Sequence, residues 1–236
     1  MKGIGLIALS TDPTGEDAFK AELSGLSVKT YTTRIHYDET DHEAGGFIPI
    51  PDWPVALGTL PPSELVEVIA FLCTSATIAL GNEVLLAHLN AARPGLRYTS
   101  PGIAAVAMMQ RFRFKRIAVL TPYGPTLHSA ISHYFAGHGI HVVAGHSLAQ
   151  SLNLVTDEDI SNVSLSRIQR ELEELHLAAS PLDALFVSCA AFSISKSDLK
   201  EMAVALGSPV LASVNTTAWH CLDLLGEHEL AEKLIR

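Results

Sequence analysis

Short apolar runs alternate with amphipathic stretches along almost the whole chain. The runs are rich in β-branched residues and end in small or polar residues, a pattern typical of buried strands in parallel sheets. We expect strands over residues 4–9, 28–35, 67–72, 96–99, 116–120, 140–144, 182–188 and 210–212. Helical patterns lie between them, over 17–23, 74–80, 83–92, 103–110, 126–138, 159–178, 197–206 and from 217 onward. Strands that alternate with helices predict an α/β fold with helices on both faces of parallel sheets.

The second half of the chain repeats the pattern of the first. Three pairs of segments match in kind at offsets of 113 to 116 residues, and they are anchored at Ile4 and Ile117, Cys73 and Cys189, and Leu96 and Val210. The repeat predicts two pseudo-symmetric lobes. The first comprises residues 1–95 with a C-terminal helix, 216–236, and the second comprises residues 96–215. Because parallel sheets bind ligands at the carboxyl ends of their strands, we expect the site in the cleft between the lobes.

Two cysteines stand at matching strand ends. Cys73 and Cys189 each end an apolar run, whereas Cys221 lies inside a predicted helix and is expected to be a core residue. A lone buried cysteine usually acts as a small hydrophobic residue, so the duplicated context is what favours a functional role. At a strand end, the following N–H groups and a helix dipole can stabilise a thiolate.

Two thiols on opposite sides of one carbon permit two kinds of reaction. One thiolate can remove a proton while the other thiol delivers one to the opposite face. Alternatively, a thiolate can add to a double bond and allow rotation about the resulting single bond. Neither route needs a metal or an organic cofactor, and we expect neither.

Composition narrows the range of partners. The chain has 236 residues, 48% hydrophobic and 17% charged, as expected of a folded protein. A net charge of −9 argues against nucleic acid as a partner. No apolar stretch reaches the roughly 18 residues of a membrane span, and no signal segment is recognised, so no membrane partner is expected. Three cysteines without a CxxC pair predict free thiols in a reducing cytoplasm.

Other chemistry is poorly supported. The eleven histidines are scattered and form no spacing typical of a metal site. The chain has no GxGxxG motif, no P-loop and no GxSxG elbow, which disfavours nucleotide binding and serine hydrolysis.

The segments around the cysteines resemble the aspartate/glutamate racemase superfamily. The closest resemblance is to the branch that holds maleate cis–trans isomerases, arylmalonate decarboxylases and ectoine-utilisation proteins. The matching segments are 5–12, 73–75, 116–123, 185–189 and 215–219, which span nearly the whole chain. The resemblance implies two flavodoxin-like lobes, an active site between them, cofactor-independent chemistry and a small carboxylate as substrate. A homo-oligomer, dimer or tetramer, is expected.

Carried over by position, the resemblance assigns roles to particular residues. Cys189 becomes the main acid/base and Cys73 the opposing base or nucleophile. Thr74, Ser75 and Tyr123 are implied to donate hydrogen bonds to the substrate carboxylate or enolate. Asn153 is implied to bind a second carboxylate, and Ala190 to contact the substrate. The decarboxylases of this branch keep only the second cysteine, with glycine at the first position, so decarboxylation is disfavoured here.

Asp12 departs from the maleate isomerase pattern, which has an asparagine that binds a carboxylate at this position. A desolvated carboxylate would repel a dianion such as maleate and could instead receive an ammonium or amidinium group. That favours a racemase or isomerase of an amino-acid derivative, on the ectoine-utilisation side of the branch. Alternatively, Asp12 before Pro13 simply caps a helix. Ala190 and Ala191 also replace the hydroxyl pattern that often follows the second cysteine.

The leading hypothesis is therefore a two-cysteine isomerase or racemase of a small carboxylate. An arylmalonate decarboxylase-like enzyme and a non-catalytic metabolite-binding protein remain alternatives. The predicted loop 37–62, rich in Asp, Gly and Pro, is expected to determine substrate choice.

Overall fold

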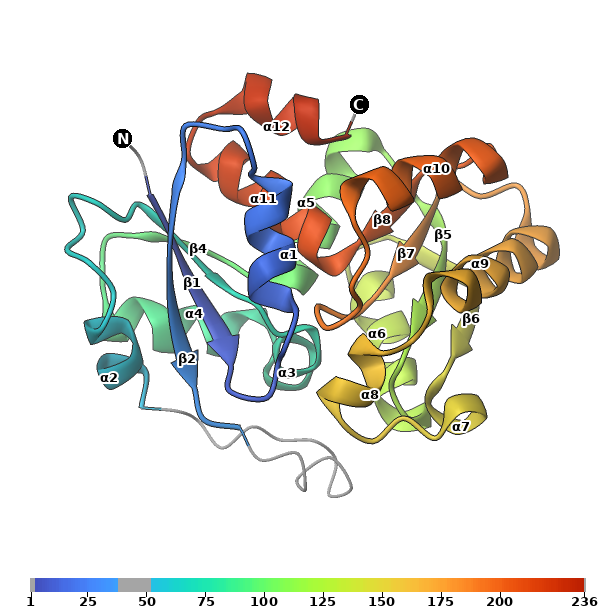
Figure 1. Cartoon of the computed structure of the whole chain (residues 1–236), viewed down its shortest axis with the longest axis horizontal. Coiled ribbons are helices and arrows are strands. Elements are labelled where there is room, and N and C mark those ends of the chain that lie inside the picture. Colours follow the sequence, from blue (N-terminus) through green and yellow to red (C-terminus); the bar gives the residue numbers. More distant parts are fainter. Residues whose placement is uncertain (1–2, 38–51, 236) are drawn as a thin grey trace.

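Two sheets of four parallel strands lie side by side in the computed structural model, which describes residues 3–37 and 52–235 (Figure 1). The first sheet has the spatial order β2 (Lys29–Ile35), β1 (Gly3–Leu9), β3 (Val68–Phe71) and β4 (Arg97–Thr99). The second has the order β6 (His141–Ser147), β5 (Arg116–Thr121), β7 (Ala184–Val187) and β8 (Val210–Ala212). The two orders are the same, which confirms the α/β class and the two-lobed repeat.

Helices cover both faces of each sheet. In chain order they are α1 (Gly15–Glu22), α2 (Trp53–Gly58), α3 (Thr74–Leu80), α4 (Asn82–Ala92), α5 (Pro101–Phe112), α6 (Pro125–Gly137), α7 (Ala149–Leu152), α8 (Asp157–Ser161), α9 (Leu165–Ala179), α10 (Lys196–Leu206), α11 (Ser213–Leu224) and α12 (His228–Ile235). On the first sheet, α1 and α11 pack on one face and α2 and α4 on the other. On the second, α5 and α6 pack on one face and α9 and α10 on the other.

The predicted lobe boundary at residue 95 is wrong by one strand. β4 follows this boundary, yet it pairs in parallel with β3 and belongs to the first sheet. The first sheet therefore ends at Thr99, and α5 then leads into the second half. At the end of the second sheet, α11 runs back to contact β3 and β4 of the first. Helices α5 and α11 pack against each other where the two halves meet.

Three local predictions also differ from the structure. The helix expected over 159–178 is two helices, because Ser164 accepts a hydrogen bond from the backbone N–H of Arg167 and starts α9 separately from α8. The strand expected over 182–188 is shorter and spans Ala184–Val187. Most of the predicted loop 37–62 lies outside the described residues, and its last part contains α2.

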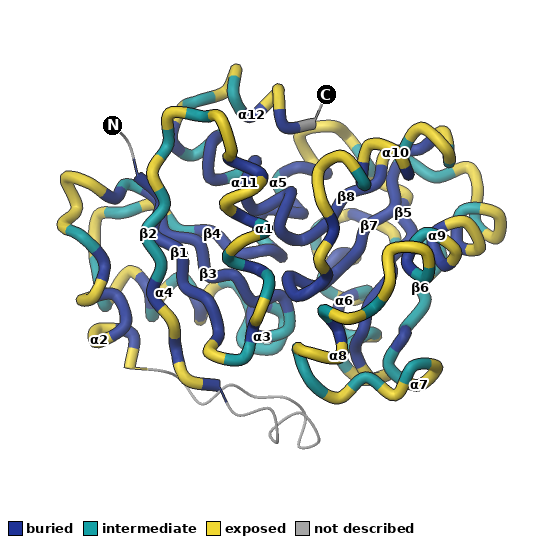
Figure 2. Tube along the Cα trace, in the orientation of Figure 1, coloured by how far each residue is buried: buried dark blue, intermediate teal, exposed yellow. Residues whose placement is uncertain are grey.

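The core depends on the two-sided burial of the strands. In β1, Ile4 and Leu6 face an apolar interior shared with the second sheet, whereas Ile7 and Leu9 face a separate cluster beneath α2 and α4. Figure 2 shows the central strands β1, β3, β5 and β7 buried in the two halves, the edge strands β2 and β6 largely half-buried, and exposed residues on the surrounding helices and loops. One continuous apolar core therefore joins the halves and fixes the two sheets against each other.

The described part of the chain contains no helix that is both long enough and apolar enough to cross a membrane.

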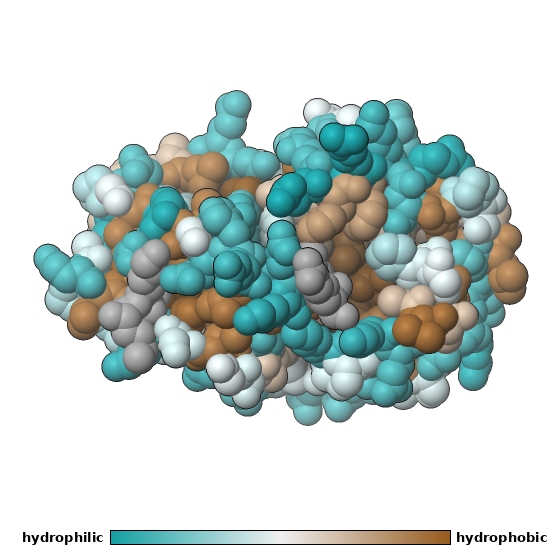
Figure 3. All heavy atoms as spheres, turned by 90° about the horizontal axis from the view of Figure 1, so that it is seen from above, coloured by the Kyte–Doolittle hydropathy of each residue, from teal (hydrophilic) through white to brown (hydrophobic). Residues whose placement is uncertain are grey.

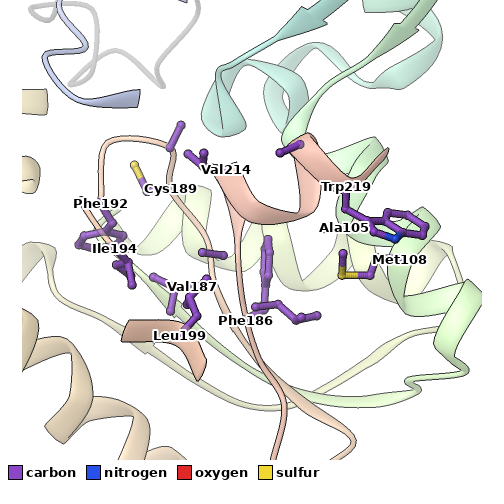
Figure 4. Close-up of a cluster of buried hydrophobic side chains, with 14 of the residues drawn as sticks. Ala105, Met108, Phe186, Val187, Cys189, Phe192, Ile194, Leu199, Val214 and Trp219 are labelled. Carbon is purple, nitrogen blue, oxygen red and sulfur yellow. The ribbon is translucent and has the colours of Figure 1, made fainter. Parts of the chain in front are cut away.

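Phe186 tests the shared core. It is 1% exposed, its ring meets that of Phe135 edge-on at 5.6 Å, and in Figure 4 it lies between Leu199 and the side chains of Met108 and Trp219. We expect Phe186→Ala to lower the free energy of unfolding by about 3–5 kcal/mol in urea titrations, because it leaves a cavity. Val204→Ala, at a side chain 77% exposed, should change it by less than about 0.5 kcal/mol. A loss below about 1 kcal/mol at Phe186 would contradict a tightly packed shared core.

Candidate active site

The carboxyl ends of β1 and β3 meet those of β5 and β7 at a small buried pocket between the halves. Its volume is about 20 Å³, room for about one water molecule. The lining residues are Leu9, Asp12, Tyr37, Leu72, Cys73, Thr74, Ser75, Tyr123, Asp157, Cys189, Ala190 and Ala191. Both halves thus contribute to one site, at the sheet edge where a ligand was expected.

Most of the predicted site residues meet in this pocket. Those that line it are Cys73, Cys189, Asp12, Thr74, Ser75, Tyr123 and Ala190. Asn153 is the exception, because it is exposed in a left-handed conformation (φ 50°) at the end of α7 and does not line the pocket. The structure therefore does not bring Asn153 together with the other predicted site residues.

Cys73 occupies the transition from strand to helix. It follows the buried run of β3, has an extended backbone (φ −140°, ψ 112°) and directly precedes α3. Its Sγ lies 3.3 Å from Oγ of Ser75, and the side chain is 4% exposed. Burial raises the pKa of the Cys73 thiol to about 12. Hydrogen bonds from Ser75 and from the backbone N–H of Ala76 oppose the rise, whereas the charges of Asp157 and Asp12 add to it.

Cys189 stands in a loop instead of at a helix start. It follows β7 and Ser188, and the next helix, α10, begins only at Lys196. Burial again raises the thiol pKa, and the charge of Asp157 adds to the rise. The hydroxyl of Tyr123 donates a hydrogen bond that lowers the pKa of Cys189. Tyr123 is itself buried, and its pKa is well above the usual value for that reason and because of Cys189.

Burial thus raises the pKa of both thiols in this structure. Backbone N–H groups of Ala76 and Ala191 lower the pKa of the adjacent thiols, as expected, but burial raises it by more. Cys221 fits the expected core role: it is fully buried within α11, and burial raises its pKa as well.

Hydrogen bonds between the halves hold the pocket together. Oγ1 of Thr11 donates to Oδ2 of Asp157 at 2.7 Å, and Oγ1 of Thr14 donates to the carbonyl of Ala191 at 3.0 Å. At the other cysteine, Oγ1 of Thr74 donates to Oγ of Ser213 at 3.1 Å. Each bond joins a residue near one thiol to the opposite half, so the relative position of the strand ends is set by polar contacts as well as by the core.

Asp12 acts as a helix cap and also lines the pocket. Its Oδ1 accepts backbone N–H bonds from Thr14 at 3.0 Å and Gly15 at 2.8 Å, at the start of α1. The residue is only 4% exposed and lines the pocket. A Cβ at Gly15 would lie 2.2 Å from Oδ2 of Asp12, so a larger residue there would displace the carboxylate. The two interpretations of Asp12 from the sequence are thus compatible.

Sequence reasoning missed two polar lining residues, Asp157 and Tyr37, besides the apolar Leu9, Leu72 and Ala191. Asp157 begins α8, where Thr156 and Asp159 form a capping box. That Thr-x-x-Asp pattern signals a helix start soon after β6, but the helix predicted over 159–178 begins two residues after Asp157. Tyr37 lies two residues after the end of β2, and it belongs to no sequence motif.

A larger hollow lies away from this chemistry. A groove of about 430 Å³ runs between α10, β8 and α12, and its residues include Lys196, Lys200 and Pro209. Figure 3 shows apolar surface in a hollow between hydrophilic rims in the right-hand half of the molecule. This groove reaches the amino end of β8 and has no thiol in its lining, so the small pocket is the better candidate. In the described residues, no group of three or more His, Cys, Asp or Glu side chains is placed to hold a metal ion.

Comparisons with known proteins show which family and which solved structures this chain resembles. Residues 62–235 match a family model described as arylmalonate decarboxylase. Comparison with curated proteins finds no match.

Several solved structures share the fold over nearly the full chain. The Nocardia farcinica maleate cis–trans isomerase bound to TRIS has 19% sequence identity and a TM-score of 0.79, with 96% of this chain and 93% of that chain covered. The maleate isomerase Iso from Pseudomonas putida S16 has 16% identity and a TM-score of 0.77, covering 96% and 94%. A structure of arylmalonate decarboxylase has 17% identity and a TM-score of 0.73, covering 96% and 93%. At such identities these likenesses establish the fold.

The hydroxyl beside each thiol can be tested separately. We expect Tyr123→Phe to slow iodoacetamide labelling of Cys189 at pH 8 about tenfold or more, because it removes a hydrogen bond to the thiolate and raises the thiol pKa further. Ser75→Ala should do the same to Cys73. Peptide mass spectrometry measures labelling of Cys73 and of Cys189 in each variant. The cysteine that is not next to the substituted hydroxyl is the internal control. Unchanged or faster labelling of the adjacent thiol would contradict these hydrogen bonds.

Proposed function

This chain belongs to the arylmalonate decarboxylase family, whose members are enzymes, and we propose that it is a cofactor-independent isomerase or racemase of a small carboxylate. The observation that supports this proposal is the pairing of Cys73 and Cys189 in one buried pocket. The two thiols come from equivalent strand ends of the two halves. A substrate carbon held between them would have an acid or base on each face.

The hydroxyl groups near Cys73 suit a carboxylate. Thr74 and Ser75 follow this cysteine, and Tyr123 reaches the pocket from the other half. Thr74 and Tyr123 now donate to Ser213 and Cys189, and Ser75 is hydrogen-bonded to Cys73. When a ligand binds, these O–H groups would turn from their present partners and donate to its carboxylate. They can also donate to the enolate oxygen that develops when the adjacent carbon loses its proton, which is the charge that such donors stabilise best.

A racemisation step balances with the two thiols alone. One thiol first loses its proton to solvent. The resulting thiolate takes the proton from the carbon next to the carboxylate, and the C–H electron pair moves into the enolate. The opposite thiol then gives its proton to the other face of that carbon and is left as the thiolate. The product has inverted configuration, and the pair is ready for the reverse direction.

A cis–trans isomerisation also balances. A thiolate adds to one carbon of a C=C bond conjugated with the carboxylate, and the π electrons move into the enolate. Rotation about the new C–C single bond follows, and the enolate then re-forms the double bond as the C–S bond breaks. The thiolate is regenerated and no proton is consumed.

Decarboxylation is the second candidate, favoured by the description of the matching family model. It would break a C–C bond, release CO₂ and need one thiol to protonate the enolate. Cys189 alone would suffice, which leaves Cys73 without a role. If the protein only binds a metabolite without catalysis, neither thiol has a chemical role.

Single substitutions at the two thiols separate these functions. We expect Cys73→Ala and Cys189→Ala each to lower isomerisation or solvent-deuterium exchange by about 10²-fold or more, because each removes an acid/base or nucleophile. Cys221→Ala, outside the pocket, should retain activity. The assay follows deuterium at the carbon next to the carboxylate, optical rotation and CO₂ release over a panel of maleate, phenylmalonate and amino acids.

The pattern of losses identifies the reaction. CO₂ release that survives Cys73→Ala but not Cys189→Ala would indicate a decarboxylase. Reaction that persists in the double variant would exclude thiol catalysis, and binding of a panel member without any turnover would support a binding protein.

A further inference from the structure

The pocket has an acidic lining. Asp12 comes from the first half and Asp157 from the second, and no Lys, Arg or His is among the lining residues that the structure describes. The charges of both carboxylates raise the pKa of Cys73 and of Cys189, so both carboxylates lie within electrostatic reach of both thiols. Any ligand that sits between the thiols will experience the same negative field.

Asp12 is the better placed of the two to meet a ligand. Its Oδ1 is occupied by the N–H groups of Thr14 and Gly15, which orient the carboxylate. Its Oδ2 receives no hydrogen bond from any residue in the described part of the chain. The nearby guanidinium of Arg34 donates to the backbone carbonyls of Leu9 and Asp12 and to Glu16, not to the Asp12 carboxylate.

Asp157 is held close to this group through the neighbouring residue. Thr11, directly before Asp12, donates its hydroxyl to Oδ2 of Asp157 at 2.7 Å. The contact spans 146 positions of sequence and joins the two halves. It ties the carboxylate of Asp157 to the residue next to Asp12, and both carboxylates line the pocket.

The pocket therefore combines two kinds of polar group. The hydroxyls of Thr74 and Ser75 suit an anion, and the buried carboxylate of Asp12 suits a cation. A dianion would place its second charge in the field of Asp12 with no described cation in the lining to offset it. A ligand with one carboxylate and one cationic nitrogen satisfies both sets of groups.

We propose that the substrate carries a cationic nitrogen, an ammonium or amidinium, on or beside the carbon held between the thiols, and that Asp12 binds it. This inference rests on the proposed function and adds the substrate class. Asp12 is a specificity residue in this arrangement. The bound cation also offsets the negative field at Cys73 and Cys189, which favours formation of the thiolate only when the correct substrate is present.

The charge of the pocket can be measured without any substrate. Three small alkylating reagents are compared: cationic 2-bromoethylamine, neutral iodoacetamide and anionic iodoacetate. Rates at Cys73 and Cys189 are divided by those of free cysteine to remove intrinsic reactivity. We expect the cationic reagent to be favoured over the anionic one by about tenfold or more. Asp12→Asn, whose amide oxygen can still cap α1, should reduce this ratio at least about threefold. Asp17→Asn, an exposed carboxylate on the same helix, should not.

Ligand selectivity is then measured in a Cys73→Ser/Cys189→Ser variant, which separates binding from chemistry. Calorimetry compares 2-aminobutyrate, 2-hydroxybutyrate and methylmalonate, which have four carbons each and differ in charge. The amino acid should bind about tenfold or more tightly than the other two, and Asp12→Asn should abolish that preference.

Equal or tighter binding of the hydroxy acid or the dianion, absence of amino-acid binding, or a preference that survives Asp12→Asn overturns the proposal. Proton exchange by the native enzyme is measured separately. Loss of the charge preference with exchange intact rejects only this inference, and charge preference without exchange rejects only the proposed reaction.

Discussion

The apolar interior shared by the two sheets is the contact on which the site depends. Ile4 and Leu6 of the first sheet and Phe186 of the second belong to one cluster, so neither sheet can move without exposing core surface. Helices α5 and α11 pass between the halves and pack against each other at their junction. This arrangement holds the carboxyl ends of both sheets at one place. Two thiols 116 positions apart therefore line a single pocket.

The same burial that brings the thiols together makes them weak acids. Removing Cys73 and Cys189 from water disfavours their anions, and the pocket carboxylates act in the same direction. Ser75 and Tyr123 offset this only in part. Formation of either thiolate in this pocket therefore needs stabilisation beyond these hydrogen bonds.

The scaffold is symmetric but the chemistry is not. Thr74 follows the first cysteine and donates to Ser213, whereas Ala190 follows the second and has no hydroxyl. At the helix starts that follow the last strand of each sheet, Ser100 precedes α5 whereas Ala212 precedes α11. The hydroxyls of Thr74 and Ser75 thus stand beside Cys73, and alanines follow Cys189. Such inequality gives a bound molecule one preferred orientation in an otherwise two-fold site.

The sequence by itself determined the architecture, because buried parallel strands have a distinct apolar pattern and the repeat of that pattern implies equivalent strand ends. It therefore predicted both cysteines and the residues next to them. What only the tertiary structure decided depends on contacts between distant segments. β4 joins the first sheet through pairing with β3, and Asp157 reaches the pocket through a hydrogen bond to Thr11. Asn153, assigned by position alone, lies on the surface. The protonation of the thiols also depends on burial by both halves, which no local pattern records.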